Sequence, residues 1–251
     1  KTFIRNPSTA ESELSIGQMA DDGIAVTEYL RQQLRKDKVI LMGSSWGSAL
    51  GIHIIKTRPE LFVAYIGTAQ IVSQVANQKA SYVTTLAKAR TAGDQTMIKA
   101  LEEIGSPPWM NPRNTGILRR ATKVLEAKSS IAAPKQCWIP ASSYRMEEFE
   151  AQYEAAEEYA FLQFFGFKNN GMYSTIDFPA MGFNFAIPMF FVQGEEDLVT
   201  VPEVSKAYFE QIQAPRKGYF LVSKAGHNPN LASVAMEYKV LMEQVHPLLK
   251  K

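Results

Sequence analysis

The sequence predicts an α/β fold with a mostly parallel sheet, and three observations support this prediction. Residues 38–43 form an apolar, β-branched run that passes through a glycine-containing turn into an amphipathic run ending at Arg58-Pro59. Residues 62–68 and 187–192 are again short apolar runs, which are typical of buried strands. Between them, from about 70 to 184, helical periodicity replaces strand-like runs. Strands and helices that alternate around a helical insertion indicate a parallel sheet with an inserted cap.

The length of the chain allows one such domain with an insertion. With 251 residues, we expect a first part of the core at 1–69, a helical cap at 70–184 and a second part of the core at 185–251. Residues 1–14 have no periodicity and contain Asn6-Pro7, which predicts a loop. Ser15 and Gln18 have the spacing of a capping box and predict that a helix begins after Ser15.

Composition excludes several classes of partner. The net charge of +2 argues against a nucleic-acid or anionic-membrane partner, and no apolar run approaches the roughly 20 residues of a membrane span. The single cysteine, Cys137, excludes an intrachain disulfide and a cysteine-based zinc site. We therefore expect Cys137 to be a small packed side chain in a reducing compartment, which favours the cytoplasm.

The turn at Gly43-Ser44-Ser45-Trp46-Gly47 is the candidate nucleophile site. In a strand-to-helix turn of the form Gly-x-Ser-x-Gly, the serine takes a strained backbone conformation and its Oγ stands above the sheet. We expect glycine at 43 and 47 to prevent clashes with neighbouring backbone, and the N–H of Trp46 to face a developing oxyanion. The alternative is an ordinary turn, since turns collect glycine and serine. The strand before and the helix after favour Ser45 as the nucleophile.

Later loops supply candidates for the other two catalytic groups. The strand at 187–192 is followed by Glu195, Glu196 and Asp197, of which Asp197 is favoured because its short side chain suits a fixed hydrogen bond to a histidine. A last strand at 219–222 precedes His227, which lies beside a glycine in a loop. The alternative base is His246, near the end of the last helix, whereas His53 lies more than two helical turns beyond Ser45 and points away from it.

The predicted cap has helices at roughly 72–91, 94–104, 114–127 and 145–165. The last of these is rich in aromatic residues and glutamates. One interpretation is that Glu154, Glu157 and Glu158 face the pocket and bind a substrate ammonium group. The alternative is an amphipathic helix whose glutamates are simply solvated.

The order of Ser45, Asp197 and His227 along the chain is that of the α/β-hydrolase fold. The segments Gly43-Ser44-Ser45-Trp46-Gly47-Ser48, Gly194-Glu195-Glu196-Asp197 and Gly226-His227-Asn228-Pro229 resemble the prolyl aminopeptidase (proline iminopeptidase) branch of that family, whose members carry a helical cap. This sequence departs from the pattern of the family in two respects. Members often have histidine where this chain has Ser44, and their early His-Gly-Gly-Pro and Asp-Gln-Arg-Gly segments are not found here.

The resemblance implies that the first four strands of the family fold are absent from this sequence, because Lys1-Thr2-Phe3 resembles the stretch that comes directly after Asp-Gln-Arg-Gly in family members. The strand at 38–43 is central in the family and would otherwise have an unpaired apolar edge. We therefore expect another segment or a companion chain to pair with this strand and to supply the second oxyanion donor.

The predicted chemistry is acyl transfer without a metal or cofactor. Ser45 would attack a carbonyl, His227 would take its proton, and Asp197 would fix the imidazole tautomer. We expect an aminopeptidase that releases N-terminal proline or another small residue. The alternatives are a carboxylesterase acting on small apolar esters and, from another class, a non-catalytic binding protein on a hydrolase scaffold.

Overall fold

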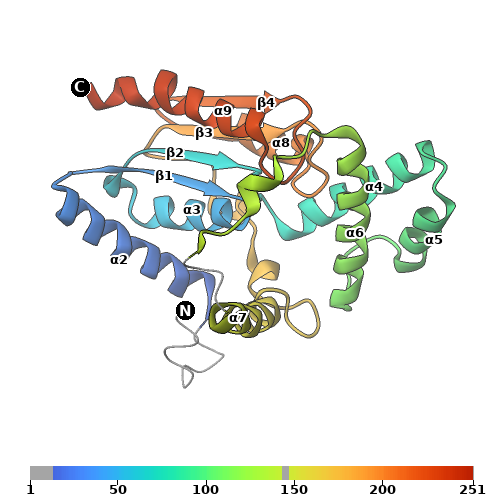
Figure 1. Cartoon of the computed structure of the whole chain (residues 1–251). Coiled ribbons are helices and arrows are strands. Elements are labelled where there is room, and N and C mark those ends of the chain that lie inside the picture. Colours follow the sequence, from blue (N-terminus) through green and yellow to red (C-terminus); the bar gives the residue numbers. More distant parts are fainter. Residues whose placement is uncertain (1–13, 143–146, 251) are drawn as a thin grey trace.

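Four parallel strands form the centre of the molecule (Figure 1). The computed structural model describes residues 14–142 and 147–250. The strands are β1 (Val39–Ser44), β2 (Phe62–Thr68), β3 (Met189–Gly194) and β4 (Lys217–Val222), and they lie side by side in that order. Each lies on or within three residues of a strand expected from the sequence, and the predicted α/β class with a parallel sheet is confirmed.

The register of the sheet brings three loops to one edge. Ser44 pairs with Thr68, Thr68 with Val192, and Gly194 with Val222, so the carboxyl ends of all four strands lie within two residues of one level. In an open parallel sheet, ligands bind outside this edge. The segments that come after β1, β3 and β4 contain Ser45, Asp197 and His227, respectively.

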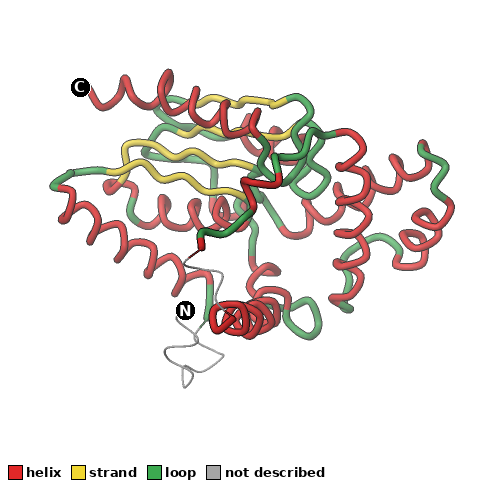
Figure 2. Tube along the Cα trace, viewed as in Figure 1, coloured by secondary structure: helices red, strands yellow, loops and turns green. Residues whose placement is uncertain are grey.

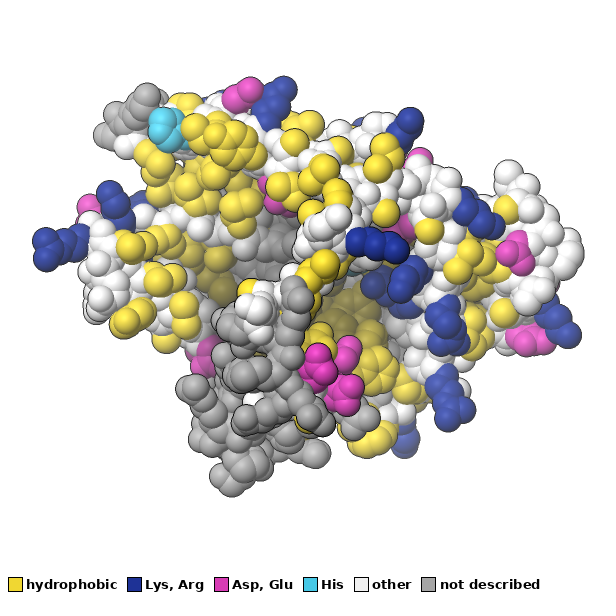
Figure 3. Space-filling view, viewed as in Figure 1, with side chains coloured by type: hydrophobic (Ala, Val, Ile, Leu, Met, Phe, Trp, Pro, Cys, Tyr) yellow, Lys and Arg dark blue, Asp and Glu magenta, His cyan; other side chains and the backbone are white. Residues whose placement is uncertain are grey.

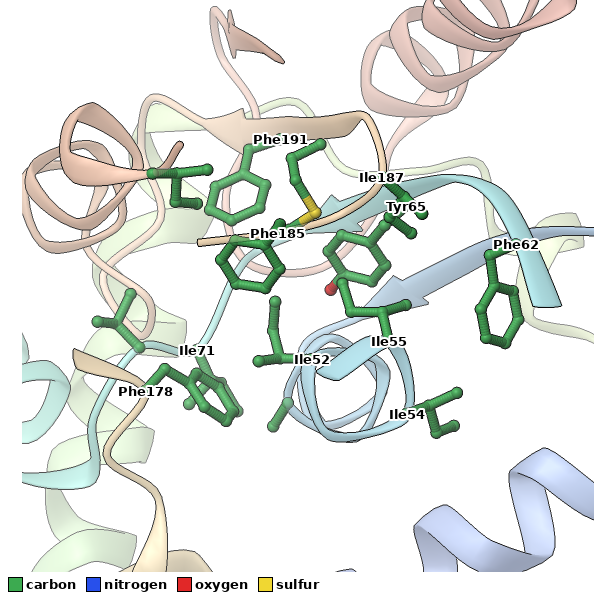
Figure 4. Close-up of a cluster of buried hydrophobic side chains, with 14 of the residues drawn as sticks. Ile52, Ile54, Ile55, Phe62, Tyr65, Ile71, Phe178, Phe185, Ile187 and Phe191 are labelled. Carbon is green, nitrogen blue, oxygen red and sulfur yellow. The ribbon is translucent and has the colours of Figure 1, made fainter. Parts of the chain in front are cut away.

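Helices cover the two faces of the sheet (Figure 2). One face carries α2 (Ile16–Leu34), α3 (Trp46–Thr57) and α8 (Pro202–Gln211), which share one apolar cluster with the sheet. In this cluster Ile52 and Tyr65 are fully buried and Phe191 nearly so (Figure 4). Burying a side chain such as Ile52 stabilises the fold by about 1.5–3 kcal/mol. The other face carries α9 (Leu231–Val240) and the helical turns Leu241–Val245 and His246–Lys250.

Four helices lie between β2 and β3 in the chain: α4 (Gln74–Thr91), α5 (Gln95–Ile104), α6 (Pro112–Ser129) and α7 (Glu147–Phe165). The first three start at Ser73, Asp94 and Asn111, whose side chains accept N-terminal N–H groups. They share a second apolar cluster, which Leu198 from the core joins. All four fall in the range expected for the cap, whose boundaries remain a prediction.

Short 3₁₀ turns connect these elements, at Pro59–Leu61, Lys135–Trp138, Met172–Thr175 and Pro179–Met181. Cys137 lies in the second of them and is exposed, so the prediction of a packed cysteine is wrong. The reason is local, because this turn buries none of its residues. Among the helices that the structure describes, none combines the length and the apolar character needed to cross a bilayer.

β1 forms one edge of the described sheet. On its outer side the described residues contribute no further strand, and the side chain of Met42 is 45% exposed. An exposed apolar edge is a template for pairing. The expectation that another segment or chain pairs with β1 is consistent with this arrangement and stays a prediction.

His53 is a packed residue of α3. Its ring meets that of Phe178 edge-on, with 5.6 Å between centroids. Burial lowers the pKa of His53, and its Nε2 has no hydrogen-bond partner among the described residues. These observations agree with a structural role for His53.

Candidate active site

Ser45 lies in the turn between β1 and α3 in a strained backbone conformation. Its φ and ψ are 51° and −116°, which non-glycine residues rarely adopt. A hydrogen bond to the neighbouring strand stabilises this conformation, since the N–H of Ser45 donates to the carbonyl of Thr68 at 3.0 Å. The turn therefore fixes the direction of the Ser45 side chain.

The two glycines of the turn differ. A Cβ on Gly43 would lie 2.3 Å from the carbonyl oxygen of Gly47, so the turn requires glycine at 43. A Cβ on Gly47 would meet no described atom within 4 Å apart from its chain neighbours and the backbone of its own helix. The expectation that glycine at 47 prevents a clash is therefore wrong for the described chain.

Trp46 is the first residue of α3. The N–H groups of the first helical turn have no acceptor within the helix, and they carry the positive end of the helix dipole. The N–H of Trp46 is thus available to an oxyanion formed next to Ser45 Oγ. The Trp46 ring packs edge-on against Phe164 of α7 at 4.8 Å between centroids, which brings α7 against the turn.

The structure brings Ser45, His227 and Asp197 together in a chain of hydrogen bonds. Ser45 Oγ lies 2.9 Å from His227 Nε2, and His227 Nδ1 lies 3.1 Å from Asp197 Oδ2. Asp197 is fully buried, and His227 is 9% exposed. In this arrangement Nδ1–H donates to the carboxylate, which leaves Nε2 as the acceptor for the serine proton.

Asp197 is held as a carboxylate by four further donors. The N–H groups of Val199 and Thr200 donate to Oδ1 at 2.8 Å, and Thr200 Oγ1 and Gln193 Nε2 donate to Oδ2 at 2.5 and 3.0 Å. Burial by itself raises the pKa of Asp197, but the charge and hydrogen bond of His227 and the bonds from Thr200 outweigh it and lower that pKa. Asp197 is therefore suited to orient the imidazole.

The alternative candidates for the catalytic acid and base are not part of this chain of hydrogen bonds. Glu195 is exposed, and Glu196 pairs with Lys88 of α4 at 2.9 Å. His246 begins the last helical turn, and α9 and the turn Leu241–Val245 separate it from the His227 loop.

A pocket opens over Ser45 and His227. Its described lining comes from the core and from α4, α6 and α7, and it is mostly apolar: Ser45, Trp46, Ile71, Gln78, Ser81, Thr115, Leu118, Arg119, Phe164, Phe165, Tyr173, Val199, Thr200 and His227. Figure 3 shows this side of the molecule, with a hollow whose floor is hydrophobic and whose α6 side carries Lys and Arg. Phe164 stacks on Tyr173 at 5.0 Å between centroids and forms the apolar wall.

The glutamates expected at the pocket lie in a different place. Glu154 and Glu157 are exposed and line a second hollow together with Phe161 and Leu162. The side chain of Glu158 lies outside the described residues. The structure thus does not bring Glu154 and Glu157 to Ser45, and their role in binding an amine stays a prediction without geometric support.

No pattern in the sequence marks Glu126, a buried carboxylate of α6 beside the triad. Its Oε1 accepts the N–H of Leu198 at 2.7 Å, and its Oε2 accepts the N–H of His227 at 3.1 Å. Burial raises the pKa of Glu126, the two N–H bonds oppose the rise, and the charge of Asp197 adds to it. Because a Cβ on Gly226 would lie 2.8 Å from Oε2, the glycine before His227 lets this carboxylate approach.

Comparison with known proteins agrees with this fold. Residues 13–230 match the family model described as serine aminopeptidase, S33. The chain is 25% identical over 230 residues to "Probable aminopeptidase YbaC" of Bacillus subtilis, covering 87% of this chain and 68% of that protein.

Two solved structures share the fold at low sequence identity. The proline iminopeptidase of Mycobacterium smegmatis is 16% identical with a TM-score of 0.59, over 97% of this chain and 74% of that one. The esterase EaEST of Exiguobacterium antarcticum is 13% identical with a TM-score of 0.55, over 94% and 76%. With the family model matching most of its length, the chain belongs to the serine aminopeptidase S33 family of α/β-hydrolases.

Proposed function

We propose that this protein is a serine hydrolase that works through an acyl-enzyme, and that it acts as an aminopeptidase releasing N-terminal proline or another small residue. The hydrogen-bonded chain from Ser45 through His227 to the buried Asp197, open to a pocket, is the observation that supports the chemistry. The family match and the aminopeptidase relative support the choice of reaction. A small peptide is the expected substrate.

The proposed reaction has two steps. Ser45 Oγ attacks the substrate carbonyl while His227 Nε2 takes its proton, and Trp46 N–H donates to the oxyanion. His227 then protonates the leaving amine, which departs and leaves the acyl group on Ser45. Water repeats the sequence with His227 as base and releases the acid. The second oxyanion donor would come from the segment expected to pair with β1.

A carboxylesterase is the second candidate, and the pocket favours it. No Asp or Glu is among the described residues that line the pocket, whereas an aminopeptidase needs an acceptor for the free amine of its substrate. The apolar wall of Trp46, Phe164 and Tyr173 suits an uncharged acyl or alcohol group. A non-catalytic binding protein is disfavoured because the three triad side chains are aligned.

Hydrolysis of proline 4-nitroanilide and of 4-nitrophenyl butyrate distinguishes the two candidates. We expect the full-length protein to cleave the anilide, to lose this activity when the proline nitrogen is acetylated, and to lose it with Ser45→Ala. Cleavage of the ester alone would replace the aminopeptidase with the esterase. A protein that cleaves neither substrate, and whose Ser45 a fluorophosphonate probe leaves unlabelled, would overturn both.

A further inference from the structure

Arg119 is the basic side chain among the described residues that line the Ser45 pocket. It lies on α6, is exposed, and also lines a second hollow, whose lining shares Val199 and His227 with that of the pocket. Its charge reaches the pocket wall: burial raises the pKa of Tyr173 to about 12, and the Arg119 charge opposes that rise. None of the ion pairs within the described residues uses its guanidinium.

The second hollow beside Arg119 carries further positive charge. Arg120 and Lys123 line this hollow, and its one described acid, Glu126, has both carboxylate oxygens occupied by backbone N–H groups. An exposed guanidinium that has no acid partner among the described residues can bind a carboxylate through two parallel hydrogen bonds, and arginine is well suited to this geometry. The pocket that contains Ser45 thus also contains one cationic side chain, Arg119.

We propose that Arg119 makes the pocket selective for substrates that carry a free carboxylate near the scissile carbonyl. In an aminopeptidase this would be the C-terminal carboxylate of a dipeptide, and in an esterase the free acid of a dicarboxylate monoester. This proposal rests on the proposed hydrolase function, but it applies to either candidate reaction.

Matched substrate pairs test the proposal. Prolyl-alanine is compared with prolyl-alaninamide, and mono-4-nitrophenyl adipate with 4-nitrophenyl hexanoate, using the full-length protein. For the pair whose bond the protein cleaves, we expect kcat/KM to favour the carboxylate by about 10- to 100-fold, the usual range for a hydrogen-bonded charge pair. Arg119→Gln should abolish most of this preference, and Arg120→Gln, one residue along the same helix, should retain it.

The possible outcomes distinguish a wrong role for Arg119 from a wrong proposed function. Equal kcat/KM for both members of a cleaved pair, or a preference that survives Arg119→Gln, would overturn the role of Arg119 while leaving the hydrolase intact. A preference lost equally in Arg119→Gln and Arg120→Gln would also overturn it, because the preference would then come from the total positive charge of α6 and not from Arg119. Failure to cleave any of the four substrates would count against the proposed function itself.

The contacts of Glu126 support a second, independent inference. Its carboxylate joins α6 of the helical insertion to two core loops, at Leu198 next to Asp197 and at the backbone of His227. It is 8% exposed, and Gly226 leaves the space it occupies. One side chain therefore fixes the separation between the loops that carry two members of the triad.

We infer that Glu126 is a positioning residue, which keeps His227 within reach of both Ser45 and Asp197. Glutamine at this position has nearly the same shape but only one oxygen, so its amide would face one of the two N–H donors. The imidazole would then lose its fixed place, and positioning errors of this kind reduce the rate of the chemical step. Binding of substrate in the pocket would be little affected, because Glu126 is not among its lining residues.

Steady-state kinetics of Glu126→Gln test this role. We expect kcat to fall about 10- to 100-fold with KM within about threefold of wild type. The NMR resonance of the His227 Nδ1–H proton should shift or broaden. The control Glu103→Gln, on α5 with a weak pair to Lys99 at 3.9 Å, should leave both unchanged.

A folded Glu126→Gln variant with wild-type kcat and an unchanged Nδ1–H resonance would overturn the inference. So would a fall in kcat/KM that comes only from KM. If the glutamine variant does not fold, Glu126→Asp gives the same test, since it keeps the charge but is one methylene too short to reach both N–H groups. Wild-type kcat in that variant would reject the positioning role.

Discussion

Ser45→Ala is expected to lower kcat by about 10⁴- to 10⁶-fold for whichever substrate the protein cleaves. Alanine removes the attacking oxygen and leaves His227 without a proton to accept. The Trp46 N–H and the pocket remain, so residual catalysis over the uncatalysed reaction should persist. The change removes one oxygen from a side chain that faces the pocket, and thermal unfolding should match that of the wild type.

Labelling with a fluorophosphonate provides the measurement that separates this loss from misfolding. The wild-type protein should gain one phosphonyl group at Ser45, and the alanine variant none. A variant that keeps more than about one per cent of the wild-type kcat would mean that another group is the nucleophile.

Gly43→Ala is expected to have the second-largest effect, through the shape of the turn. The added methyl would lie 2.3 Å from the Gly47 carbonyl oxygen and 3.0 Å from the Ser48 nitrogen, both backbone atoms that cannot rotate away. The turn must open or the strand must shift, which moves Ser45 Oγ from its 2.9 Å contact with His227. We expect kcat to fall at least about 100-fold and the midpoint of thermal unfolding to fall by several degrees.

Gly47→Ala is the matched control, since it adds the same methyl group four residues later. There the methyl meets no described atom within 4 Å beyond its chain neighbours and its own helix backbone, and alanine is favoured over glycine inside a helix. Activity and stability should therefore stay close to wild type. Equal losses in both variants would contradict the clash at Gly43 as the cause, and would indicate that an atom outside the described residues approaches Gly47.

The sequence was sufficient to place the triad because each member is marked by local chemistry. Ser45 comes after a strand and lies between glycines, and Asp197 and His227 come after later strands in short turns. Parallel pairing then brings the three loops to the same edge of the sheet. Glu126 has no such mark, because its partners lie 72 and 101 residues away and the helix around it has ordinary spacing.

The position of the α7 glutamates relative to the pocket could not be predicted from the sequence. Periodicity indicates that a helix is present, but it does not reveal which hollow each side of the helix faces. The contacts of Phe164 with Trp46 and Tyr173 set the rotation of α7, and Trp46 is distant from α7 in the sequence. Glu154 and Glu157, more than one turn earlier, consequently line a different hollow.

The pairing of β2 with β3 has a consequence for the way the chain folds. Tyr65 lies beside Met189, so the two central strands can meet only after all four inserted helices have been synthesised. Closing such a long loop is entropically costly, and chains dominated by distant contacts fold slowly. During synthesis β1 and β2 must wait with the face that α9 later covers exposed, and α4, α5 and α6 have time to assemble their own cluster first. Refolding should therefore show the helical signal of the insertion before the hydrogen bonds of the central sheet become protected from exchange.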